Sequence, residues 1–193
     1  KSNLYCFTNG INCVSHSCKY NKNKIVFVGN MRTLQNQDAV LYFVNEIYPL
    51  IKNKVKGVEF HIVGAEPPEK IKQLAKSDKS IVVTGFVDSV EKYIMDAAIL
   101  VAPVRIAAGI QNKVLIGMAC KVPVVMTSLI SKAIPELIND ENCIIVDESK
   151  LFATKCLELL NNKTLRNKIA ENGYKIVNDF YSWDKVLNGY EDI

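Results

Sequence analysis

Short β-branched runs alternate with helical patterns along most of this 193-residue chain, and no other feature constrains its fold as strongly. Strand-like runs separated by helices favour a parallel sheet, because each crossover helix returns the chain to the same end of the sheet. We therefore predict an α/β fold, a doubly wound six-stranded parallel sheet with helices on both faces. The predicted strands are residues 24–29, 59–63, 81–84, 98–102, 122–127 and 143–146.

Helices fill the segments between these strands and the C-terminal part of the chain. In the first of them Val40, Val44, Ile47 and Ile51 recur at the period of a helix that lies on a sheet. The predicted helices span residues 37–51, 68–76, 89–96, 111–120, 132–138, 150–160 and 164–180, and a last one starts at Ser182.

Composition excludes several classes of protein. With 49% hydrophobic residues the chain can bury one ordinary core, which excludes disorder over most of its length. Its 24 basic and 20 acidic residues are spread without a basic stripe, so we expect no nucleic-acid partner. The longest apolar run, residues 97–104, is far shorter than the roughly 20 residues that cross a bilayer, so we expect no transmembrane segment in this chain. Because the chain opens on Lys1, we also expect it to be a piece of something longer.

The six cysteines fit a reducing cytoplasm better than a disulfide scaffold. Three of them lie inside apolar or helical patterns, and we predict buried thiols at Cys120, Cys143 and Cys156. The other three lie near the start with a histidine close by, which makes a metal site conceivable: Cys6, Cys13 and Cys18, with His16. Their spacing lacks a CxxC pair and is wider than that of most zinc ligands, so we favour incidental thiols and no metal.

A ligand of such a sheet lies beyond the carboxyl ends of the strands, where the strand order reverses. One loop there, "APVRIAAGIQNK", leads into the predicted helix 111–120. The amides of Gly109, Ile110 and Gln111 would point to one spot, which Arg105 and Lys113 flank. A lysine is disfavoured at a helix N-terminus, and a bound phosphate would reverse that penalty.

The alternative is that Lys113 is solvated and that Asn112 only helps the helix to start; position alone leaves both open. The first strand adds weight to an anion site, since Gly29 and Asn30 are followed by Arg32 in a second cationic loop. The chain has neither a GxGxxG fingerprint nor a GxxxxGK(S/T) loop, so dehydrogenase and P-loop NTPase functions lose their main support.

Several quoted stretches carry a family resemblance. "TNGIN" (8–12) precedes the first strand, and "GIQNKVLIGMACKVPVVMT" (109–127) contains the helix with Lys113. Between them stand "IVFVGNMRTLQNQDAVLYF", "FHIVGAEPPEKIKQL" and "IVVTGFVDSVEKYIMDAAILVAPVR". In this order they resemble the C-terminal, donor-binding domain of the group 1 glycosyltransferases of GT-B architecture. The last motif resembles the branch of that family that reads GIQNKVLEAMA.

The resemblance implies roles for particular residues. Arg105 and Lys113 would hold the donor diphosphate and stabilise it as it leaves, while the nucleotide base would rest near Gly85, Phe86 and Val87. The other donor-binding residues that it implies are Gly29, Asn30, Arg32, Gly109, Ile110, Gln111, Asn112 and Ile116.

The chain departs from the family at three places. Many relatives carry glutamates where this chain has Ala108 and Ile116, and the second glutamate normally accepts hydrogen bonds from the ribose. Losing such a charged hydrogen bond costs about 1.5 to 3 kcal/mol, or roughly tenfold to hundredfold in affinity. The lysine of the family's usual "KG" in the first loop is also missing, with Asn36 and Gln37 near its place.

Three segments outside these loops need an interpretation. His61 is centred in a predicted core strand, and we interpret it as a satisfied structural histidine rather than a catalytic base. Pro135 and Glu136 resemble the "pEl" segment that meets the donor in relatives, or they begin a helix; both interpretations stay open. Trp183 lies in a C-terminal helix that packs back toward the other domain in the family, so we assign it to packing.

The resemblance implies an enzyme, a hexosyltransferase-like glycosyltransferase that moves a sugar from a UDP- or GDP-sugar to a saccharide or lipid-linked acceptor. It implies retention of configuration and no metal or other cofactor. The expected organisation is an interdomain segment (1–23), a nucleotide-sugar-binding domain (24–181) and a C-terminal helix (182–193) that packs toward an N-terminal domain. That domain would bind the acceptor, so this chain alone should be inactive; the longer protein should be cytoplasmic or lie at the inner face of the membrane.

Two alternatives remain. A degenerate GT-B domain could serve as an interaction module without donor chemistry, and Ala108 and Ile116 motivate this reading. A nucleotide-sugar epimerase has a related two-domain fold, but it needs catalytic carboxylates and a histidine in the cleft. That set cannot be located in this sequence.

Overall fold

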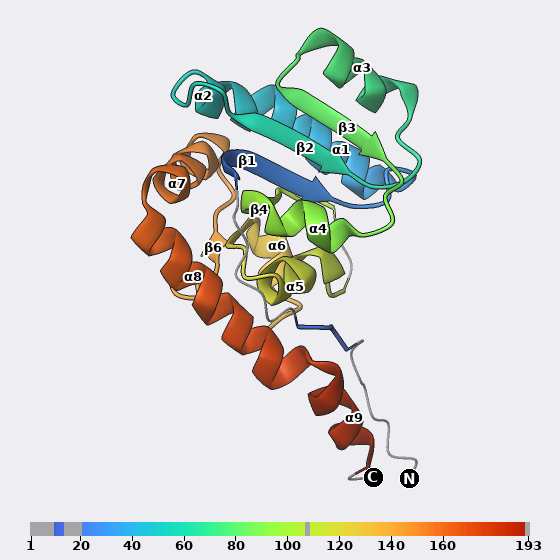
Figure 1. Cartoon of the computed structure of the whole chain (residues 1–193), viewed down its shortest axis with the longest axis vertical. Helices are drawn as coiled ribbons and strands as arrows, with labels where there is room; N and C mark the ends of the chain where they lie inside the picture. The colour runs from blue at the N-terminus through green and yellow to red at the C-terminus, as the bar shows by residue number, and fades with distance from the viewer. Residues whose placement is uncertain (1–9, 14–20, 107–108, 192–193) are drawn as a thin grey trace.

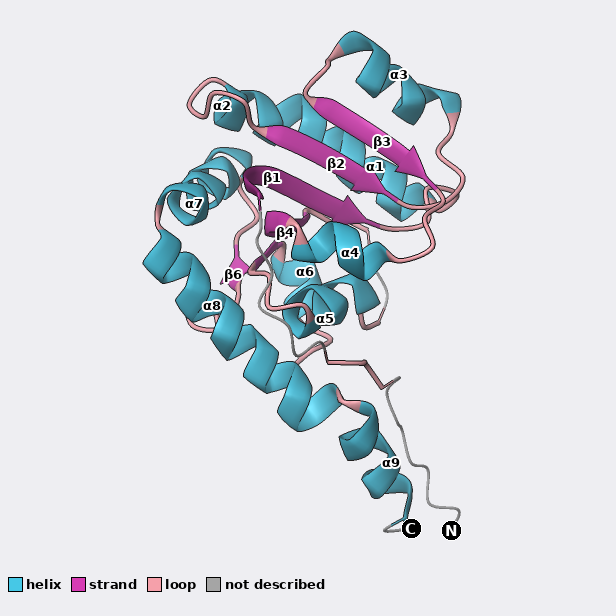
Figure 2. Ribbon diagram, in the orientation of Figure 1, coloured by secondary structure: helices cyan, strands magenta, loops and turns pink. Residues whose placement is uncertain are grey.

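The sheet has six parallel strands in the order β3-β2-β1-β4-β5-β6. The computed structural model describes residues 10–13, 21–106 and 109–191, with side chains as far as Leu187. The strands are β1 (Asn21–Val28), β2 (Glu59–Val63), β3 (Ile81–Gly85), β4 (Ala97–Ala102), β5 (Val124–Met126) and β6 (Ile144–Ile145). The arrows of β1, β2 and β3 point the same way in Figure 2. The predicted α/β fold with a six-stranded parallel sheet is therefore confirmed.

Helices cover both faces of the sheet (Figure 1). On one face lie α1 (Leu34–Tyr42), η1 (Phe43–Ile47), α2 (Tyr48–Lys52), α3 (Glu69–Ser77) and α7 (Ser149–Asn161). On the other lie α4 (Val90–Met95), α5 (Asn112–Ala119) and α8 (Lys163–Ile176). The short α6 (Ser128–Ser131) follows β5, and η2 (Val177–Tyr181) and α9 (Trp183–Glu191) continue beyond α8.

The centre of the sheet is buried on both faces, which explains why β1 and β4 read as unbroken apolar runs rather than alternating ones. An aromatic cluster joins the sheet to one helical layer: the Phe43 and Phe60 ring centroids are 4.6 Å apart, and Tyr48 and Phe152 pack beside them. The Tyr48 hydroxyl donates to the Val58 carbonyl at 3.0 Å, so its polar atom is satisfied within this core.

The prediction of a helix at residues 132–138 is wrong. The helix in this part of the chain is α6, and it ends at Ser131, before the predicted start. Pro135 lacks an amide hydrogen and disfavours helical backbone at the residue before it. The buried Asn142 side chain then replaces the helical hydrogen bonds, since it accepts from the Ile138 amide and donates to the Glu136 carbonyl. The first helical segment also begins earlier than expected, at Leu34.

Residues 10–13 lie against the C-terminal helices. The Ile11 amide donates to the Tyr181 carbonyl at 2.7 Å, and Ile11 forms an isolated bridge with Ser182. A Cβ on Gly10 would lie only 2.3 Å from the Trp183 ring, so the indole packs directly on the Gly10 backbone. Trp183 therefore packs against the segment that enters the domain, and its side chain is 45% exposed; packing toward another domain stays a prediction.

The cysteine predictions divide by position. The three predicted buried thiols, Cys120, Cys143 and Cys156, are buried. Cys13 is half-buried and free, while Cys6, Cys18 and His16 lie outside the described residues. Within the described ranges no group of His, Cys, Asp and Glu side chains could hold a metal ion, and no helix is long and apolar enough to span a membrane.

Candidate functional site

The candidate site lies at the carboxyl edge of the central strands. The strand order runs from β1 through β2 to β3 on one side and from β4 through β5 to β6 on the other, so the direction reverses between β1 and β4. Open α/β sheets bind ligands at this place. The loops after β1 and β4 are the two that the sequence singled out as cationic.

Backbone contacts draw the loops after β1, β2 and β3 together. The Gly29 amide donates to the Val63 carbonyl at 3.0 Å, and the Gly64 amide donates to the Gly85 carbonyl at 3.2 Å. A Cβ on Gly64 would lie 1.9 Å from the Gly29 oxygen, so only glycine allows these two backbones to approach. Backbone atoms of the glycines at the strand ends therefore form one surface of the site.

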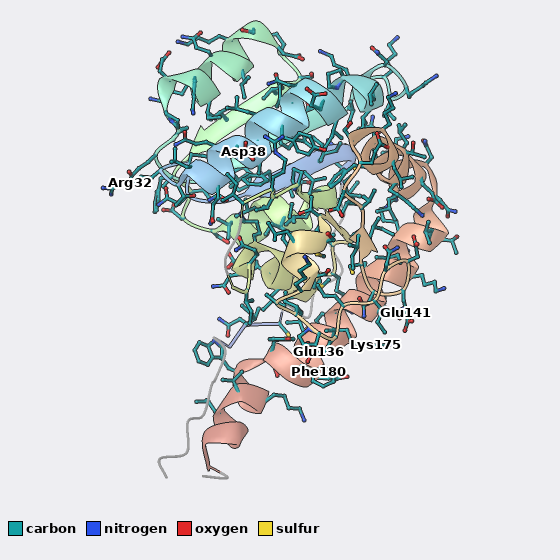
Figure 3. All side chains as sticks on the ribbon, turned by 180° about the vertical axis from the view of Figure 1, so that it is seen from behind. Arg32, Asp38, Glu136, Glu141, Lys175 and Phe180 are labelled. Carbon is teal, nitrogen blue, oxygen red and sulfur yellow. The ribbon has the colours of Figure 1, made fainter. Side chains whose placement is uncertain are left out.

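Asn30 organises the loop after β1. Its Oδ1 accepts from the Arg32 amide at 2.8 Å, and its carbonyl accepts from Asn36 Nδ2 at 2.8 Å. The Arg32 side chain is 78% exposed and lies 3.9 Å from the Glu66 carboxylate. Figure 3 shows it projecting away from the body of the protein.

Lys113 is buried, at 8% exposed, which rules out the alternative that it is solvated. Its Nζ donates to Asn36 Oδ1 and lies 4.8 Å from the centroid of the Phe27 ring. None of the described residues pairs a carboxylate with it, and burial lowers the pKa of Lys113 from 10.5 to about 8. The part of the chain that the structure describes therefore holds a cation at the carboxyl end of β1 and gives it no counter-charge.

Arg105 has a different environment. Its guanidinium donates to both carboxylate oxygens of Asp38, at 2.6 and 3.0 Å, and lies 4.4 Å from the Tyr42 ring centroid. These hydrogen bonds raise the pKa of Arg105. Asn36 and Asp38 are two positions apart on α1 and so point in different directions. The two cations contact α1 from different sides instead of flanking one spot.

The start of α5 presents both buried and exposed groups. Gln111 is buried, Asn112 is exposed, and Ile116 is half-buried one turn further along the same helical face. Gly109 has a φ of +66°, where an L side chain is disfavoured, and Ile110 packs partly against the core. Ala108 lies outside the described residues.

The segment expected near the nucleotide base is open. Gly85 has a φ of +72° and no heavy atom within 4 Å of a Cβ built on it. The Phe86 side chain is 77% exposed, and Val87 is partly buried. An exposed aromatic ring beside a glycine gives a planar ligand a surface to stack on.

Glu136 and His61 face other partners. The Tyr181 hydroxyl donates to Glu136 Oε2, and burial together with this carboxylate raises the pKa of Tyr181. In Figure 3 Glu136 lies well away from Arg32 and Asp38, and neither interpretation of Glu136 predicts its contact with Tyr181. The His61 Nε2 lies 3.0 Å from Glu59, but its buried Nδ1 has no hydrogen-bond partner among the described residues. The prediction of a satisfied histidine therefore holds for one ring nitrogen.

Sequence reasoning missed the two groups that hold the cations. In the sequence Asn36 is only a residue near the place of an absent lysine, and no pattern points to Asp38. The signal for both was weak, because Asn36 is 77 residues from Lys113 and Asp38 is 67 residues from Arg105.

The family model for glycosyl transferases group 1 matches residues 22–162. An uncharacterized 44.6 kDa protein in the cps region of Klebsiella pneumoniae is 24% identical over 187 residues, which cover 91% of this chain and 48% of that protein. The chain thus spans about half the length of this curated relative.

Solved structures show the same fold. TarM from S. aureus, in complex with UDP and other ligands, is 19% identical with a TM-score of 0.81 over all of this chain and 39% of TarM. HepE from Anabaena, in complex with UDP, is 13% identical with a TM-score of 0.73 over 88% of this chain and 48% of HepE. The C-terminal domain of LpcC from Francisella tularensis is 22% identical with a TM-score of 0.67, over 89% of this chain and 96% of that domain. This chain therefore belongs to the group 1 glycosyltransferase family and has the fold of its C-terminal domain.

Proposed function

We propose that this chain is the donor-binding domain of a GT-B glycosyltransferase that transfers a sugar from a nucleotide diphosphate sugar to an acceptor. The observation that carries the proposal is the buried Lys113 ammonium at the carboxyl edge of β1, which no described carboxylate neutralises. A buried charge without a partner is costly, and a diphosphate would supply the missing negative charge. The UDP complexes of TarM and HepE favour a UDP-sugar over a GDP-sugar as the donor.

In the proposed reaction the chain stabilises the leaving group. Negative charge grows on the diphosphate as its bond to the sugar breaks, and the Lys113 ammonium and the amides at the start of α5 would stabilise it. Arg105 would contribute once its guanidinium turns away from Asp38. The resemblance to the GIQNKVL branch also leads us to propose retention of configuration and charge neutralisation by these cations rather than by a metal.

The proposed domain organisation keeps the expected boundaries. Residues 1–23 would enter the domain, residues 24–181 would bind the donor, and residues 182–193 would pack toward an N-terminal domain that binds a saccharide or lipid-linked acceptor. The contact of Ile11 with Tyr181 and Ser182 supports this arrangement, because it brings the entering and leaving segments together. The chain alone would then be inactive, and the longer protein would work in the cytoplasm or at the inner face of the membrane.

A second candidate is an interaction module that has lost donor chemistry. Ile116 favours it, since a half-buried apolar side chain stands where relatives offer a carboxylate to the ribose. The pairing of Arg105 with Asp38 also removes one cation from the site. The two candidates differ in whether the chain binds a nucleotide.

Calorimetric titration of the purified chain with UDP, GDP and their sugars separates the two. We expect UDP to bind, and we expect Lys113→Met to weaken binding about a hundredfold, since losing one partner of a buried charge contact costs about 2 to 5 kcal/mol. Lys76→Met is the matched control, because Lys76 lies on α3 and is 62% exposed. No binding of any nucleotide at millimolar concentration would contradict the donor site. Equal binding by Lys113→Met and the unaltered chain would contradict the role of Lys113.

A further inference from the structure

The Asn36 side chain joins α5 to the loop after β1. Asn36 lies on α1 and is 5% exposed. Its Oδ1 accepts from Lys113 Nζ, and its Nδ2 donates to the Asn30 carbonyl at 2.8 Å. A Cβ on Gly29 would lie 2.6 Å from the same Nδ2, so the amide occupies space that glycine leaves free. One buried amide thus fixes both the ammonium and the loop beside it.

Both contacts require an amide. A lysine ammonium can only donate and a backbone carbonyl can only accept, so Oδ1 must face Lys113 and Nδ2 must face Asn30. An aspartate at position 36 would direct its second oxygen at the Asn30 carbonyl, and a lysine would repel Lys113. Asparagine is therefore the residue type that satisfies both neighbours.

The amide also leaves the charge of Lys113 uncancelled. Phe27 from β1 and Asn36 from α1 face the ammonium, and none of the described residues places a charged group in contact with it. Lys24 shows the contrasting case in the same protein: it is equally buried, but its ammonium lies 2.9 Å from the Asp96 carboxylate. Burial of a lysine in this fold thus does not by itself exclude a carboxylate partner.

We propose that Asn36 is a positioning residue of the donor site, which holds the Lys113 ammonium beside the loop after β1 while keeping its charge available for the donor diphosphate. This inference rests on the proposed function. It assigns to Asn36 a role beyond packing: the side chain sets where the positive charge lies and preserves it. In this proposal Lys113, which extends from α5 and donates to Asn36, supplies the positive charge that the absent lysine of the first loop would otherwise supply.

The test measures UDP binding against pH for Asn36→Asp and Asn36→Ala. From pH 7.5 to 9 the terminal phosphate of UDP is ionised, because its second pKa is about 6, and the ionisation of the uracil ring toward the upper limit is the same for every variant, so differences between variants report the protein. The affinity of the unaltered chain should fall as pH rises through about 8, where Lys113 loses its proton. Asn36→Asp pairs with Lys113, so we expect UDP to bind about tenfold more weakly at pH 7.5 and the inflection to move upward. Asn36→Ala removes the acceptor, so the inflection should move downward.

Gln37→Met is the matched control for the loop. Gln37 is also buried and also holds the loop after β1, since its Nε2 donates to the Met31 carbonyl at 2.7 Å, whereas Lys113 donates to Asn36. The inflection should stay at the pH of the unaltered chain in this variant. The thermal midpoint of each variant shows whether it is folded. If Asn36→Ala does not fold, Asn36→Asp, which keeps the size of the side chain, still tests the proposal.

The outcomes separate this inference from the proposed function. Opposite movements of the inflection in the two Asn36 variants support the positioning role. If the unaltered chain binds UDP and Lys113→Met does not, while Asn36→Asp keeps both affinity and inflection, only the inference is overturned. If the unaltered chain binds no nucleotide, the proposed function is overturned and the inference with it.

Discussion

Arg105 lies in the loop after β4, and Lys113 lies in α5, the helix that follows this loop, yet one side chain is exposed and the other is buried. Lys113 is buried, and among the described residues its ammonium donates to the Asn36 amide oxygen and lies over the Phe27 ring. The Arg105 side chain is 52% exposed and is held by the Asp38 carboxylate. Their surroundings, and not their shared place in the sequence, decide which of them keeps a charge available for a ligand.

The contacts of Arg105 and Lys113 also differ in free energy. An exposed ion pair contributes about 0 to 1 kcal/mol, so the Arg105 guanidinium can leave Asp38 at little cost. A buried ammonium without a counter-charge is costly instead, and its place is fixed by packing and by one amide. Lys113 therefore sets the position of the proposed diphosphate, and Arg105 is the adjustable member of the pair.

The largest expected effect concerns the stability cost of Lys113. Its pKa in the folded chain, about 8, lies below the ordinary 10.5, which corresponds to a cost of about 3 kcal/mol for the charged form. Below pH 8 Lys113 is protonated in both the folded and the unfolded chain, so the full cost of burying its charge lowers the free energy of unfolding there. Between pH 8 and 10.5 the unfolded chain binds more protons, and the free energy of unfolding rises with pH. Lys113→Met should thus be more stable than the unaltered chain at pH 7, and the gap should narrow as pH rises to 10.5.

Urea denaturation of both proteins at several pH values measures this gap, since the other titrating groups cancel in the difference. Arg105→Met is the control, because an arginine stays charged throughout, and its difference should not vary with pH below the range in which the neighbouring Tyr42 titrates, whose pKa is raised from 10.0. A gap of constant size for Lys113→Met would contradict the buried, easily deprotonated state of Lys113.

The next effect concerns the ribose side of the site. Ile116→Glu restores a carboxylate on the half-buried face that Ile116 shares with Asn112, and we expect it to tighten UDP binding about tenfold, the value of one hydrogen bond to a charged group. Ile116→Gln offers the same reach without charge and should give a smaller gain. Calorimetry of the two variants measures the ratio. Equal or weaker binding by Ile116→Glu would show that the face of α5 with Ile116 does not receive the ribose.

Sequence reasoning predicted the sheet well because its signal is local. Residues 25–28 and 97–102 are buried on both faces, so hydrophobicity alone marks them as central strands. The prediction of a helix at 132–138 is wrong because Pro135 disfavours helical backbone before it and because the Asn142 side chain supplies the hydrogen bonds there. Helical periodicity alone carries no information on such a side-chain partner.

The candidate site was predictable in its location but not in its pairings. The loop glycines and the resemblance located the residues around Gly29 and Lys113 at one edge of the sheet. The sequence does not show that Asn36 contacts Lys113 while Asp38 contacts Arg105. These residues are two positions apart on α1, so their side chains point in different directions and contact different partners. Side-chain direction depends on the exact helix start, which began three residues before the predicted position.

The smallest expected effect comes from making Arg105 resemble Lys113. Asp38→Asn keeps the size of the side chain but removes the carboxylate, so Arg105 loses its charged partner and becomes free to turn toward a diphosphate. We expect UDP binding to tighten about twofold to fivefold, with less than about 1 kcal/mol lost in stability, as for other exposed pairs. Asp78→Asn is the matched control: Asp78 pairs with Lys52 at 2.6 Å, so its loss should lower stability without changing UDP affinity. Weaker binding by Asp38→Asn would mean that Asp38 holds Arg105 where the ligand needs it, and Arg105 would then be a fixed part of the site like Lys113.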